Sequence, residues 1–269
     1  ANIVRDIAVR DPRVRLISLT ELPAGWTGKN NALATGANAA RGDWLLFVDS
    51  DTRHEPENLS IMMEYARRER ADMVSLLPRM RNGSFWESVL QPVAGSMLML
   101  NYPLDQVNDD DDPSKAFANG QYILIRRKVY DAIGGHGAVR DKFVEDIHLA
   151  RLLREKKYRV RLAIAPELTS TRMYTSFRDL VRGWSRILYA GFDCSAFHLG
   201  GMLCVLALVS LSSYVVLAAT VTSWFMGHTS PFVSTLFGMC LVHMGLQFTV
   251  MKRAYAFTAS GRRYVVFYG

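Results

Sequence analysis

Charged residues are spread unevenly along the chain, and this divides it into two parts. The first 192 residues mix apolar and charged positions, whereas no Asp, Glu, Lys or Arg occurs between Asp193 and Lys252. A helix needs about 20 apolar residues to cross a bilayer. Residues 199–225 and 231–251 both reach that length, and a Gly- and Pro-containing turn lies between them. The pattern therefore predicts a transmembrane region over residues 194–269, with two spans paired as a hairpin.

In the first part, short apolar runs alternate with segments of helical periodicity. Runs of bulky and β-branched residues predict strands at residues 14–19, 44–48, 73–77, 121–126 and 159–165. The segments between them predict helices at residues 30–41, 56–70, 85–100, 128–133 and 144–156. Strands that alternate with helices indicate an α/β fold with a mostly parallel sheet. We assign residues 1–175 to this domain.

A juxtamembrane amphipathic helix is predicted within residues 176–193. Ser176 and Asp179 match a capping box at its start. Three arginines recur every four residues and so line one face: Arg178, Arg182 and Arg186. Such a face fits an anionic bilayer surface, and it fits a phosphorylated substrate at that surface equally well. The Met- and Leu-rich helix at residues 85–100 is also open to two interpretations, a core helix or one lying on the membrane.

The net charge of +7 and the pI near 9.4 indicate an anionic partner: a nucleotide, a phospholipid surface or a nucleic acid. Basic residues lie on both sides of the predicted hairpin, which places both sides in the cytosol. We therefore expect a multi-pass protein of the plasma (inner) membrane with residues 1–175 in the cytosol. Nucleic-acid binding would not explain the two spans. A hairpin buried in a soluble core is the alternative, but soluble helices of this length usually carry a charged face.

Candidate chemistry begins where the run Trp44–Val48 stops on two carboxylates, Asp49 and Asp51. A short unbroken apolar run is typical of a strand buried on both faces of a parallel sheet. The turn after such a strand lies at the carboxyl edge, where α/β proteins bind ligands. Two carboxylates there can hold a divalent cation and, through it, a diphosphate. The alternative is an Asp/Ser turn that caps the next helix.

Two further motifs lie at predicted helix starts. Lys29 follows Gly28 at the first of them, where free N–H groups and an ammonium suit an anion. Glu145 and Asp146 begin the other, about a hundred residues after the first acids. They are either helix caps or a general base held near a hydroxyl group. We interpret the acidic run at residues 109–112 as a solvated loop rather than a metal site.

These motifs, in this order, resemble a known family. The order is Gly28-Lys29, Asp49-Ser50-Asp51, Asn119-Gly120-Gln121, Glu145-Asp146, Arg182-Gly183-Trp184 and then membrane helices. It resembles the membrane-bound inverting glycosyltransferases of family 2, and especially the bacterial relatives of ceramide glucosyltransferases and the hopanoid-associated glycosyltransferases. The resemblance covers nearly the whole chain. It implies a Rossmann-like GT-A fold, mostly parallel in its sheet, followed by a transmembrane helical hairpin.

The resemblance also implies a role for each matched residue. Asp49 and Asp51 would be the DxD acids, which bind the ribose and diphosphate of the donor through Mg²⁺ or Mn²⁺. Asp146 would be the base that deprotonates the acceptor hydroxyl, supported by Glu145. The other donor-site residues would be Lys29 near the nucleotide, Gly120 and Gln121 beside the donor or acceptor sugar, and Arg182 and Trp184 near the diphosphate and acceptor. Inversion needs one base and charge neutralisation on the leaving diphosphate, but no nucleophilic side chain.

The chain departs from the family pattern in two places. Gly183 stands where the family has an Arg before the Trp, so Arg182 or Arg186 would have to substitute. The family also begins with a strand, a helix and a strand that hold the nucleotide base and include an early Asp. Asp6 and Asp11 do not have that context. We therefore expect the GT-A domain to lack its first strands and the chain to be cut at both ends.

The expected reaction is sugar transfer from a nucleotide-sugar, with a UDP-sugar as the expected donor, to a lipid or lipid-linked hydroxyl at the cytosolic membrane face. One alternative is a truncated or degenerate transferase that binds the nucleotide-sugar without turnover. Another is a haloacid-dehalogenase-type phosphatase, whose nucleophile also follows a buried strand in a DxDx(Thr/Val) motif. Arg53 occupies the Thr/Val position here and argues against it.

Overall fold

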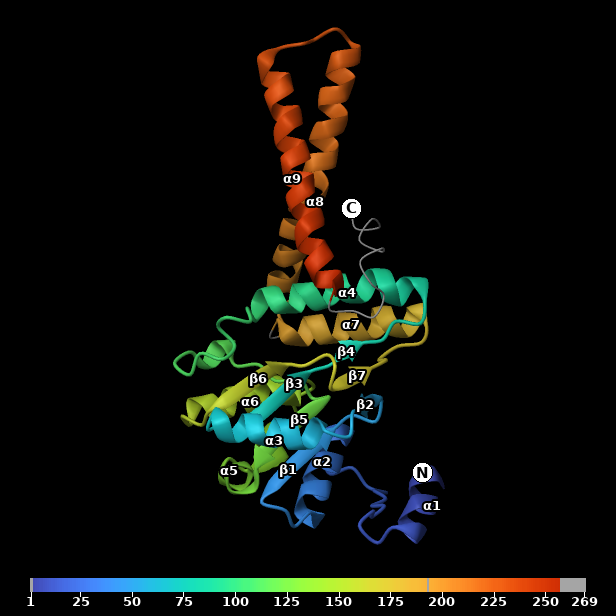
Figure 1. Ribbon diagram of the computed structural model, residues 1–269, viewed down its shortest axis with the longest axis vertical. Helices are drawn as coiled ribbons and strands as arrows, with labels where there is room; N and C mark the ends of the chain where they lie inside the picture. Colours follow the sequence, from blue (N-terminus) through green and yellow to red (C-terminus); the bar gives the residue numbers. More distant parts are fainter. Residues whose placement is uncertain (1, 193, 257–269) are drawn as a thin grey trace.

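The computed structural model describes residues 2–192 and 194–256 (Figure 1). A four-stranded sheet forms its centre, in the order β1 (Trp44–Val48), β5 (Tyr122–Arg126), β3 (Met73–Leu77) and β6 (Val160–Ile164). β3 and β6 pair in parallel, and β5 is antiparallel to both of its neighbours, β1 and β3. Three strands therefore run one way and β5 runs against them. The α/β prediction is confirmed, with the sheet mixed and mostly parallel in strand direction.

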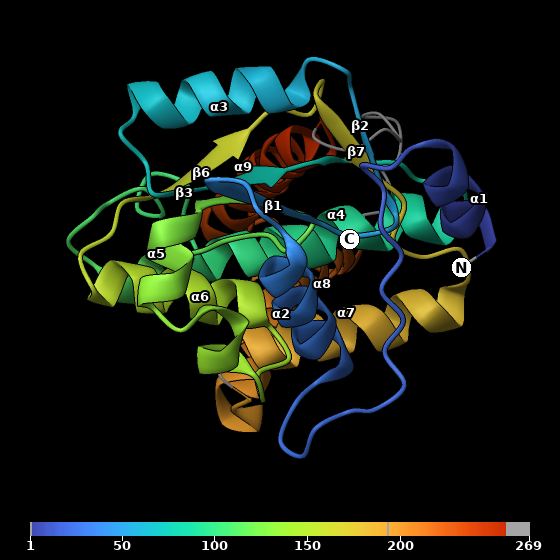
Figure 2. The ribbon, with the colours of Figure 1, turned by 90° about the horizontal axis from the view of Figure 1, so that it is seen from below.

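Helices cover both faces of this sheet. The helices are α2 (Gly28–Ala39), α3 (Asn58–Arg68), α5 (Arg127–Ala132) and α6 (Glu145–Glu155). Figure 2 shows α3 on one face and the other three on the opposite face. Successive strand residues point to opposite faces, so Leu124 packs in the layer under α3 whereas Ile123 and Ile125 pack in the other. All four helices lie within about two residues of their predicted bounds.

β1 is buried on one face only, which corrects the prediction that it is buried on both. Leu45 and Phe47 are buried, but Leu46 and Val48 are 38% and 44% exposed. β1 is the outermost strand of the described sheet and pairs with β5 alone. Leu46 and Val48 therefore have a neighbouring strand, β5, on one side only.

The strand predicted at residues 14–19 is wrong. This segment connects α1 (Asn2–Arg10), a helix that the sequence pattern did not predict, to α2. Leu16, Ile17 and Leu19 in it are exposed. Strand preference depends on a partner strand and on side-chain packing. None of the described strands pairs with residues 14–19.

A second, small sheet lies between the central sheet and a pair of helices nearest the hairpin (Figure 1). Its order is β2 (Thr52–His54), β7 (Thr169–Thr171) and β4 (Arg79–Met80). β2 runs antiparallel to β7, and β4 runs parallel to it. Segments of two or three residues have no measurable periodicity, so this sheet could not be predicted from the sequence.

The helix pair consists of α4 (Phe85–Asn101) and α7 (Phe177–Gly191), which pack side by side. Ser84 accepts a hydrogen bond from the N–H of Glu87, and Ser176 accepts one from that of Asp179, so the predicted start of the second helix is confirmed. α4 buries residues such as Met97 and Leu98, as a core helix does. Both helices lie across the base of the hairpin (Figure 1).

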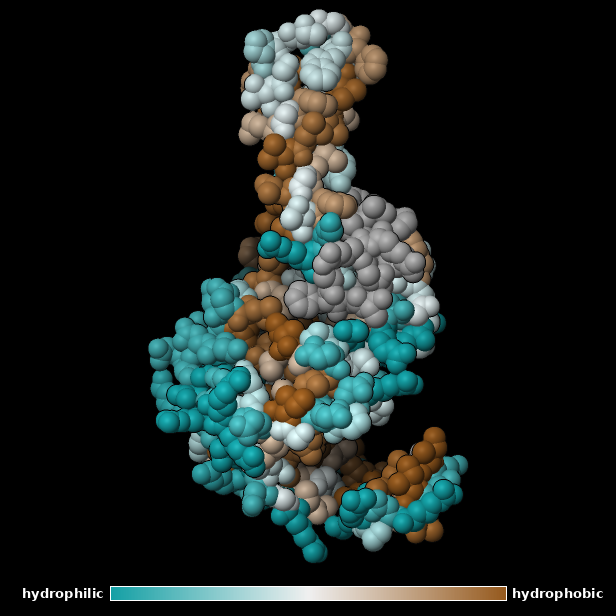
Figure 3. All heavy atoms as spheres, in the orientation of Figure 1, coloured by the Kyte–Doolittle hydropathy of each residue, from teal (hydrophilic) through white to brown (hydrophobic). Residues whose placement is uncertain are grey.

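The hairpin consists of α8 (Ala196–Phe225) and α9 (Pro231–Ala256). Both helices are long and apolar enough to cross a membrane, and only 6% of the most apolar stretch of each is buried in the protein. This exposure argues against a hairpin enclosed in a soluble core. Figure 3 shows the apolar surface along the hairpin and the mostly polar surface of the α/β part. Two of the basic residues that follow the second span, Arg262 and Arg263, lie outside the described residues.

Candidate active site

Lys29 joins carboxylates from two distant parts of the chain. Its ammonium nitrogen lies 3.0 Å from Asp49 Oδ1 and 2.8 Å from Glu145 Oε1. Lys29 belongs to the first turn of α2, Asp49 follows β1, and Glu145 begins α6. Burial disfavours the charged ammonium, but the carboxylates of Glu145 and Asp49 outweigh this effect and raise the pKa of Lys29. The lysine therefore stays charged and holds the ends of three elements together.

Asp146 is fixed through both of its carboxylate oxygens. Oδ2 accepts a hydrogen bond of 2.7 Å from the N–H of Gly120, and Oδ1 accepts one of 2.9 Å from the N–H of Ile147. Burial, and then the neighbouring charge of Glu145, raise the pKa of Asp146 to about 7 against the opposing effects of Lys29 and the two N–H groups. The first turn of α6 thus presents a carboxyl group that changes protonation near neutral pH.

Gly120 lies where these groups meet. A Cβ atom at this position would be 3.0 Å from Lys29 Nζ, 3.2 Å from Asp146 Oδ2 and 3.3 Å from Glu145 Oε1. Glycine therefore permits the close approach of the backbone to three charged groups. Just before it, Asn119 donates its N–H to Ser75 Oγ on β3 at 2.7 Å, which anchors this loop to the sheet.

Gln121 and Asp51 lie on the other side of this loop and are linked through Thr171. The Gln121 amide donates to Thr171 Oγ1 at 3.3 Å, and that hydroxyl lies 3.4 Å from the carbonyl oxygen of Asp51. Burial raises the pKa of Asp51, and the nearby charge of Asp49 adds to this rise. Two carboxylates that destabilise each other in this way would be stabilised by a cation between them.

Asp49 and Asp51 are suited to a cation that takes other ligands from a substrate. Among residues 2–192 and 194–256, no group of three or more His, Cys, Asp or Glu side chains is arranged to hold a metal ion. Mg²⁺ is commonly bound by one or two carboxylates together with phosphate oxygens and water. The ammonium of Lys29 already provides a positive charge beside Asp49. The donor set therefore fits a divalent cation that shares its coordination with a diphosphate.

Arg182 and Trp184 lie on α7, apart from the Lys29 cluster. Arg182 is exposed, whereas Trp184 is 6% exposed and packs with Ala94 and Leu180 in the α4–α7 layer. Their predicted contacts with the diphosphate and acceptor remain predictions. Trp184 Nε1 is buried without a hydrogen-bond partner in the described part of the chain.

Tyr174 explains why Gly183 replaces the arginine of the family pattern. A Cβ atom at Gly183 would collide with the ring of Tyr174, so a longer side chain there would require Tyr174 to move. Burial raises the pKa of Tyr174, which also lies within electrostatic reach of Arg186 and Asp51. Tyr174 therefore packs against α7 at Gly183 and lies near Asp51. Sequence reasoning missed this residue because no local motif surrounds it.

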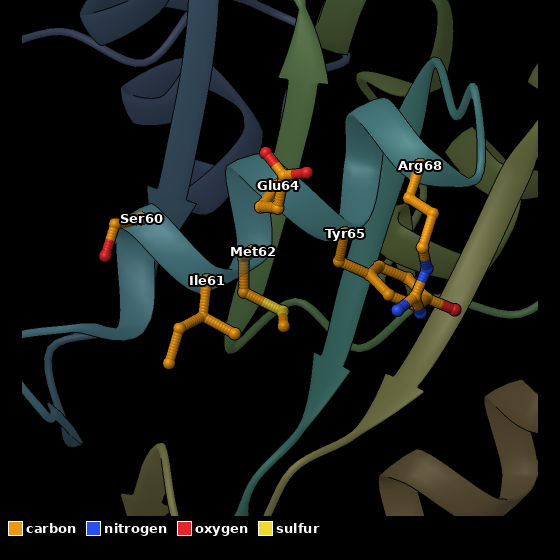
Figure 4. Close-up of a pocket in the computed structure, with 6 residues that line it drawn as sticks. All are labelled: Ser60, Ile61, Met62, Glu64, Tyr65 and Arg68. Atoms are coloured by element: carbon orange, nitrogen blue, oxygen red, sulfur yellow. The ribbon is translucent and has the colours of Figure 1, made fainter.

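A cavity of about 420 Å³ opens beside Asp51 at the small sheet. Its lining includes Arg53, Arg81 and Arg172, none of which the sequence indicated as a site residue. Isolated arginines in short strands and loops have no spacing signal. Another pocket, of about 440 Å³, is lined only by residues of α3, from Ser60 to Arg68 (Figure 4). It contains none of the motif residues.

Removal of the Lys29 ammonium is expected to destabilise the fold. The Glu145 side chain is only 4% exposed, and Lys29→Met would leave it without its cation. Because the lysine is 42% exposed and water can partly replace it, we expect a loss of about 2 kcal/mol, less than for a fully buried pair. The measurement is chemical unfolding of the full chain in detergent.

The double variant Lys29→Met/Glu145→Gln should recover most of that loss, because the buried Glu145 carboxylate, the closest partner of Lys29, is then removed as well. Lys128→Met, at an exposed lysine on α5, serves as the control and should change stability by less than about 0.5 kcal/mol. A Lys29→Met variant as stable as the control would contradict this account of the cluster.

The chain is similar to known glycosyltransferases. Residues 1–267 match the family described as Glycosyl transferase family 21. No curated protein matches the chain. One similar solved structure is the mannosyltransferase PcManGT from Pyrobaculum calidifontis in complex with GDP-Man and Mn²⁺, with 15% identity and a TM-score of 0.52 over 98% of this chain and 71% of that one. Another is glucosyl-3-phosphoglycerate synthase from Mycobacterium tuberculosis in complex with phosphoglyceric acid, with 19% identity and a TM-score of 0.41 over 70% and 62% of the two chains.

The similarity to PcManGT supports a GT-A-like fold. The phosphatase alternative receives no support from these matches. The matched family is family 21, the ceramide glucosyltransferase family. The sequence motifs had instead indicated family 2, among its relatives of ceramide glucosyltransferases. The match over nearly the whole chain shows that this glycosyltransferase belongs to glycosyl transferase family 21.

Proposed function

We propose that this glycosyltransferase moves a sugar, with inversion, from a nucleotide-sugar to the hydroxyl of a lipid or lipid-linked acceptor at the cytosolic face of the plasma (inner) membrane. The observation that carries the proposal is the position of Asp146. Its carboxylate is held by the N–H groups of Gly120 and Ile147, beside the ion pairs of Lys29 with Asp49 and Glu145. A UDP-sugar is the donor we expect.

Asp146 acts as the general base in this proposal. A base works best when its pKa lies near the working pH, and the pKa of Asp146 is raised to about 7. A carboxylate oxygen has more than one acceptor site, so each oxygen can accept from an N–H group and still approach an acceptor hydroxyl. Glu145 is a positioning residue, because it is buried and tied to Lys29.

Asp49 and Asp51 hold Mg²⁺ or Mn²⁺, which neutralises charge on the leaving diphosphate when it is bound. The PcManGT structure contains Mn²⁺ and GDP-Man, which supports a metal-bound nucleotide-sugar here. Lys29 supplies a permanent positive charge at the nucleotide side of the site. In this proposal Gly120 and Gln121 lie beside the transferred sugar, and the exposed Arg182 lies on the side of the diphosphate and acceptor.

The hairpin and the α4–α7 layer support a membrane acceptor. α8 and α9 expose apolar surface along their length. At the start of the helix pair, Trp86 lies 5.2 Å from Phe85 and 5.0 Å from Phe177 between ring centroids, and all three rings are exposed. Aromatic rings beside arginines are typical of a bilayer interface. A lipid hydroxyl, such as that of a hopanoid or a ceramide-like lipid, would reach Asp146 from this side.

Loss of the metal-binding acid tests the proposal. The full chain in lipid nanodiscs would be assayed for UDP-sugar hydrolysis and for transfer to lipid, with Mn²⁺ or with EDTA. Asp51→Ala should lower the Mn²⁺-dependent rate by about 10- to 100-fold, equivalent to about 1.4–2.7 kcal/mol, because Asp49 remains and only part of the metal's stabilisation of the leaving group is lost. It should also weaken Mn²⁺ binding, measured directly by titration.

The exposed Asp131 on α5 provides the control variant Asp131→Ala, which should keep both Mn²⁺ affinity and rate. Undiminished metal-dependent turnover in both Asp51→Ala and Asp146→Asn would refute the assigned roles. Nucleotide-sugar binding without any turnover in the unaltered protein would favour the alternative of a non-catalytic binding protein.

A further inference from the structure

We propose that the cavity beside Asp51 is a binding site for a phosphoryl group, formed by Arg172, Arg81 and Arg53. The cavity of about 420 Å³ lies at the small sheet, between the DxD turn and the start of α4. This inference rests on the proposed function only for the source of the phosphoryl group, which is either the diphosphate of the donor or a phosphate on the acceptor.

Arg172 is held rigidly by a buried acid. Its Nε atom donates a hydrogen bond to Glu87 Oε2 and its Nη2 atom donates one to Glu87 Oε1, both of 3.1 Å. The Glu87 side chain is 1% exposed, whereas that of Arg172 is 44% exposed. A two-point hydrogen bond of this kind fixes the plane of a guanidinium group. The buried Glu87 carboxylate therefore orients the accessible guanidinium group of Arg172 at the cavity.

The environment of Glu87 keeps this carboxylate charged. Burial favours its neutral form, but hydrogen bonds from Arg172, the N–H of Gly83 and Ser84 outweigh burial and lower the pKa of Glu87. The Gly83 N–H lies 2.9 Å from Glu87 Oε2. A Cβ atom at Gly83 would collide with the Arg172 guanidinium. Glycine at this position lets the arginine lie directly against the backbone.

The small sheet brings two more arginines to the same cavity. Arg53 on β2 pairs with Ser170 of β7, and Arg81 follows β4 and donates its N–H to the carbonyl oxygen of Thr171. In the described part of the chain, neither Arg53 nor Arg81 has a carboxylate within ion-pair distance. Segments around residues 53, 81 and 172 are far apart in sequence, so their convergence depends on the order β2-β7-β4.

The charges that line the cavity identify the class of ligand. Its lining contains three arginines and one acidic residue, Asp51, while the Glu87 carboxylate pairs with Arg172. A metal ion at Asp51 would make the region more positive still. Guanidinium groups match the oxygen geometry of phosphate and can bind it at two points. An anion with several oxygens, rather than a neutral sugar hydroxyl, therefore fits this cavity.

Titration with inorganic pyrophosphate tests the site without any reaction. The full chain in detergent would be titrated by calorimetry at low salt with EDTA, so that no metal bridges the anion to Asp51. The variants are Arg81→Gln and Arg172→Gln, with Arg67→Gln on the outer face of α3 as the control. We expect each cavity variant to bind pyrophosphate at least tenfold more weakly than the control. Arg81→Gln breaks no ion pair and keeps the test valid if Arg172→Gln fails to fold.

Two further probes distinguish the sources of the phosphoryl group. Weaker UDP binding in the same variants would assign the cavity to the donor diphosphate. Unchanged UDP binding, with weaker binding of phosphatidate-containing vesicles, would assign it to an acceptor phosphate. Pyrophosphate affinity that is equal in the variants and the control, or no pyrophosphate binding to the unaltered chain, would overturn the proposal.

The anion-binding test and the sugar-transfer test can fail independently of each other. Sugar transfer with unchanged anion binding in the variants would refute the phosphoryl site alone. Anion binding that depends on Arg81, in a protein without transferase activity, would refute the proposed reaction and leave the site. Glu87→Gln should also weaken pyrophosphate binding, since it releases Arg172 from its fixed position.

Discussion

Replacement of Asp146 by Asn is expected to lower the rate of sugar transfer by about 10²- to 10⁴-fold, the usual contribution of a general base. The amide cannot accept the proton of an acceptor hydroxyl, although its size is nearly that of the carboxylate. Initial rates of transfer, measured with the donor and acceptor at saturation, report this loss as a change in kcat. Donor affinity should change far less, because Asp146 is assigned to the acceptor side.

The pH dependence provides an independent readout of the same group. With the pKa of Asp146 raised to about 7, transfer by the unaltered protein should increase as the pH rises through that value. Stability should change in the opposite direction. A carboxyl group whose pKa is higher in the folded state stabilises the fold fully below its ordinary pKa, and this contribution is lost as the pH rises to about 7.

Asp146→Asn should flatten both profiles between about pH 4 and pH 7, whereas Asp131→Asn at an exposed position should leave them unchanged. Rates and unfolding midpoints would be recorded on the same preparations. An Asp146→Asn variant that retains the full rate, or a rate profile that still rises through neutral pH, would show that another group takes the proton.

The parts of this fold that could be predicted are those in which the local sequence alone marks where an element begins and ends. The strand Trp44–Val48 was predicted with its observed bounds, because a charged or polar residue follows an unbroken apolar run. Its exposure on one face could not be predicted, since that depends on which strand lies beside it. The same dependence on a partner explains why residues 14–19 do not form a strand, although their composition is typical of one.

The candidate site was predictable to the extent that its residues occupy the ends of predicted elements. Lys29, Asp49 and Glu145 lie at a helix start, a strand end and a second helix start, and the structure brings these three together. The pair of Arg172 and Glu87 could not be found in this way. These residues are 85 positions apart, and their meeting requires the small sheet whose strands are too short to predict. Tyr174 over Gly183 is a further contact between segments without a shared motif.

Trp184 belongs to a motif that implies donor binding, but its burial indicates that it stabilises the fold. Trp184→Ala is expected to destabilise the protein by about 3–5 kcal/mol, as for other large buried side chains. The indole is 6% exposed and fills the space between Ala94 and Leu180, where α4 and α7 pack beneath the hairpin. The measurement is chemical unfolding of the full chain in detergent.

Trp86→Ala is the matched control, because this tryptophan lies on α4 with 48% of its surface exposed. Its loss should cost less than about 1 kcal/mol.

Trp184→Phe separates the packing of the ring from its polar atom. Phenylalanine keeps most of the buried ring and removes the N–H group, which has no partner among the described residues. A buried donor without a partner costs about 1–3 kcal/mol, and its removal offsets much of the volume lost in this substitution. We therefore expect the free energy of unfolding of Trp184→Phe to differ by less than about 1.5 kcal/mol from that of the unaltered protein. Its affinity for UDP should be the same. A stable Trp184→Phe variant with tenfold weaker UDP binding would contradict the packing role and assign the indole to the donor, as the family pattern implies. In either case the change acts on the layer of α4 and α7, which lies between the α/β part of the protein and the hairpin of α8 and α9.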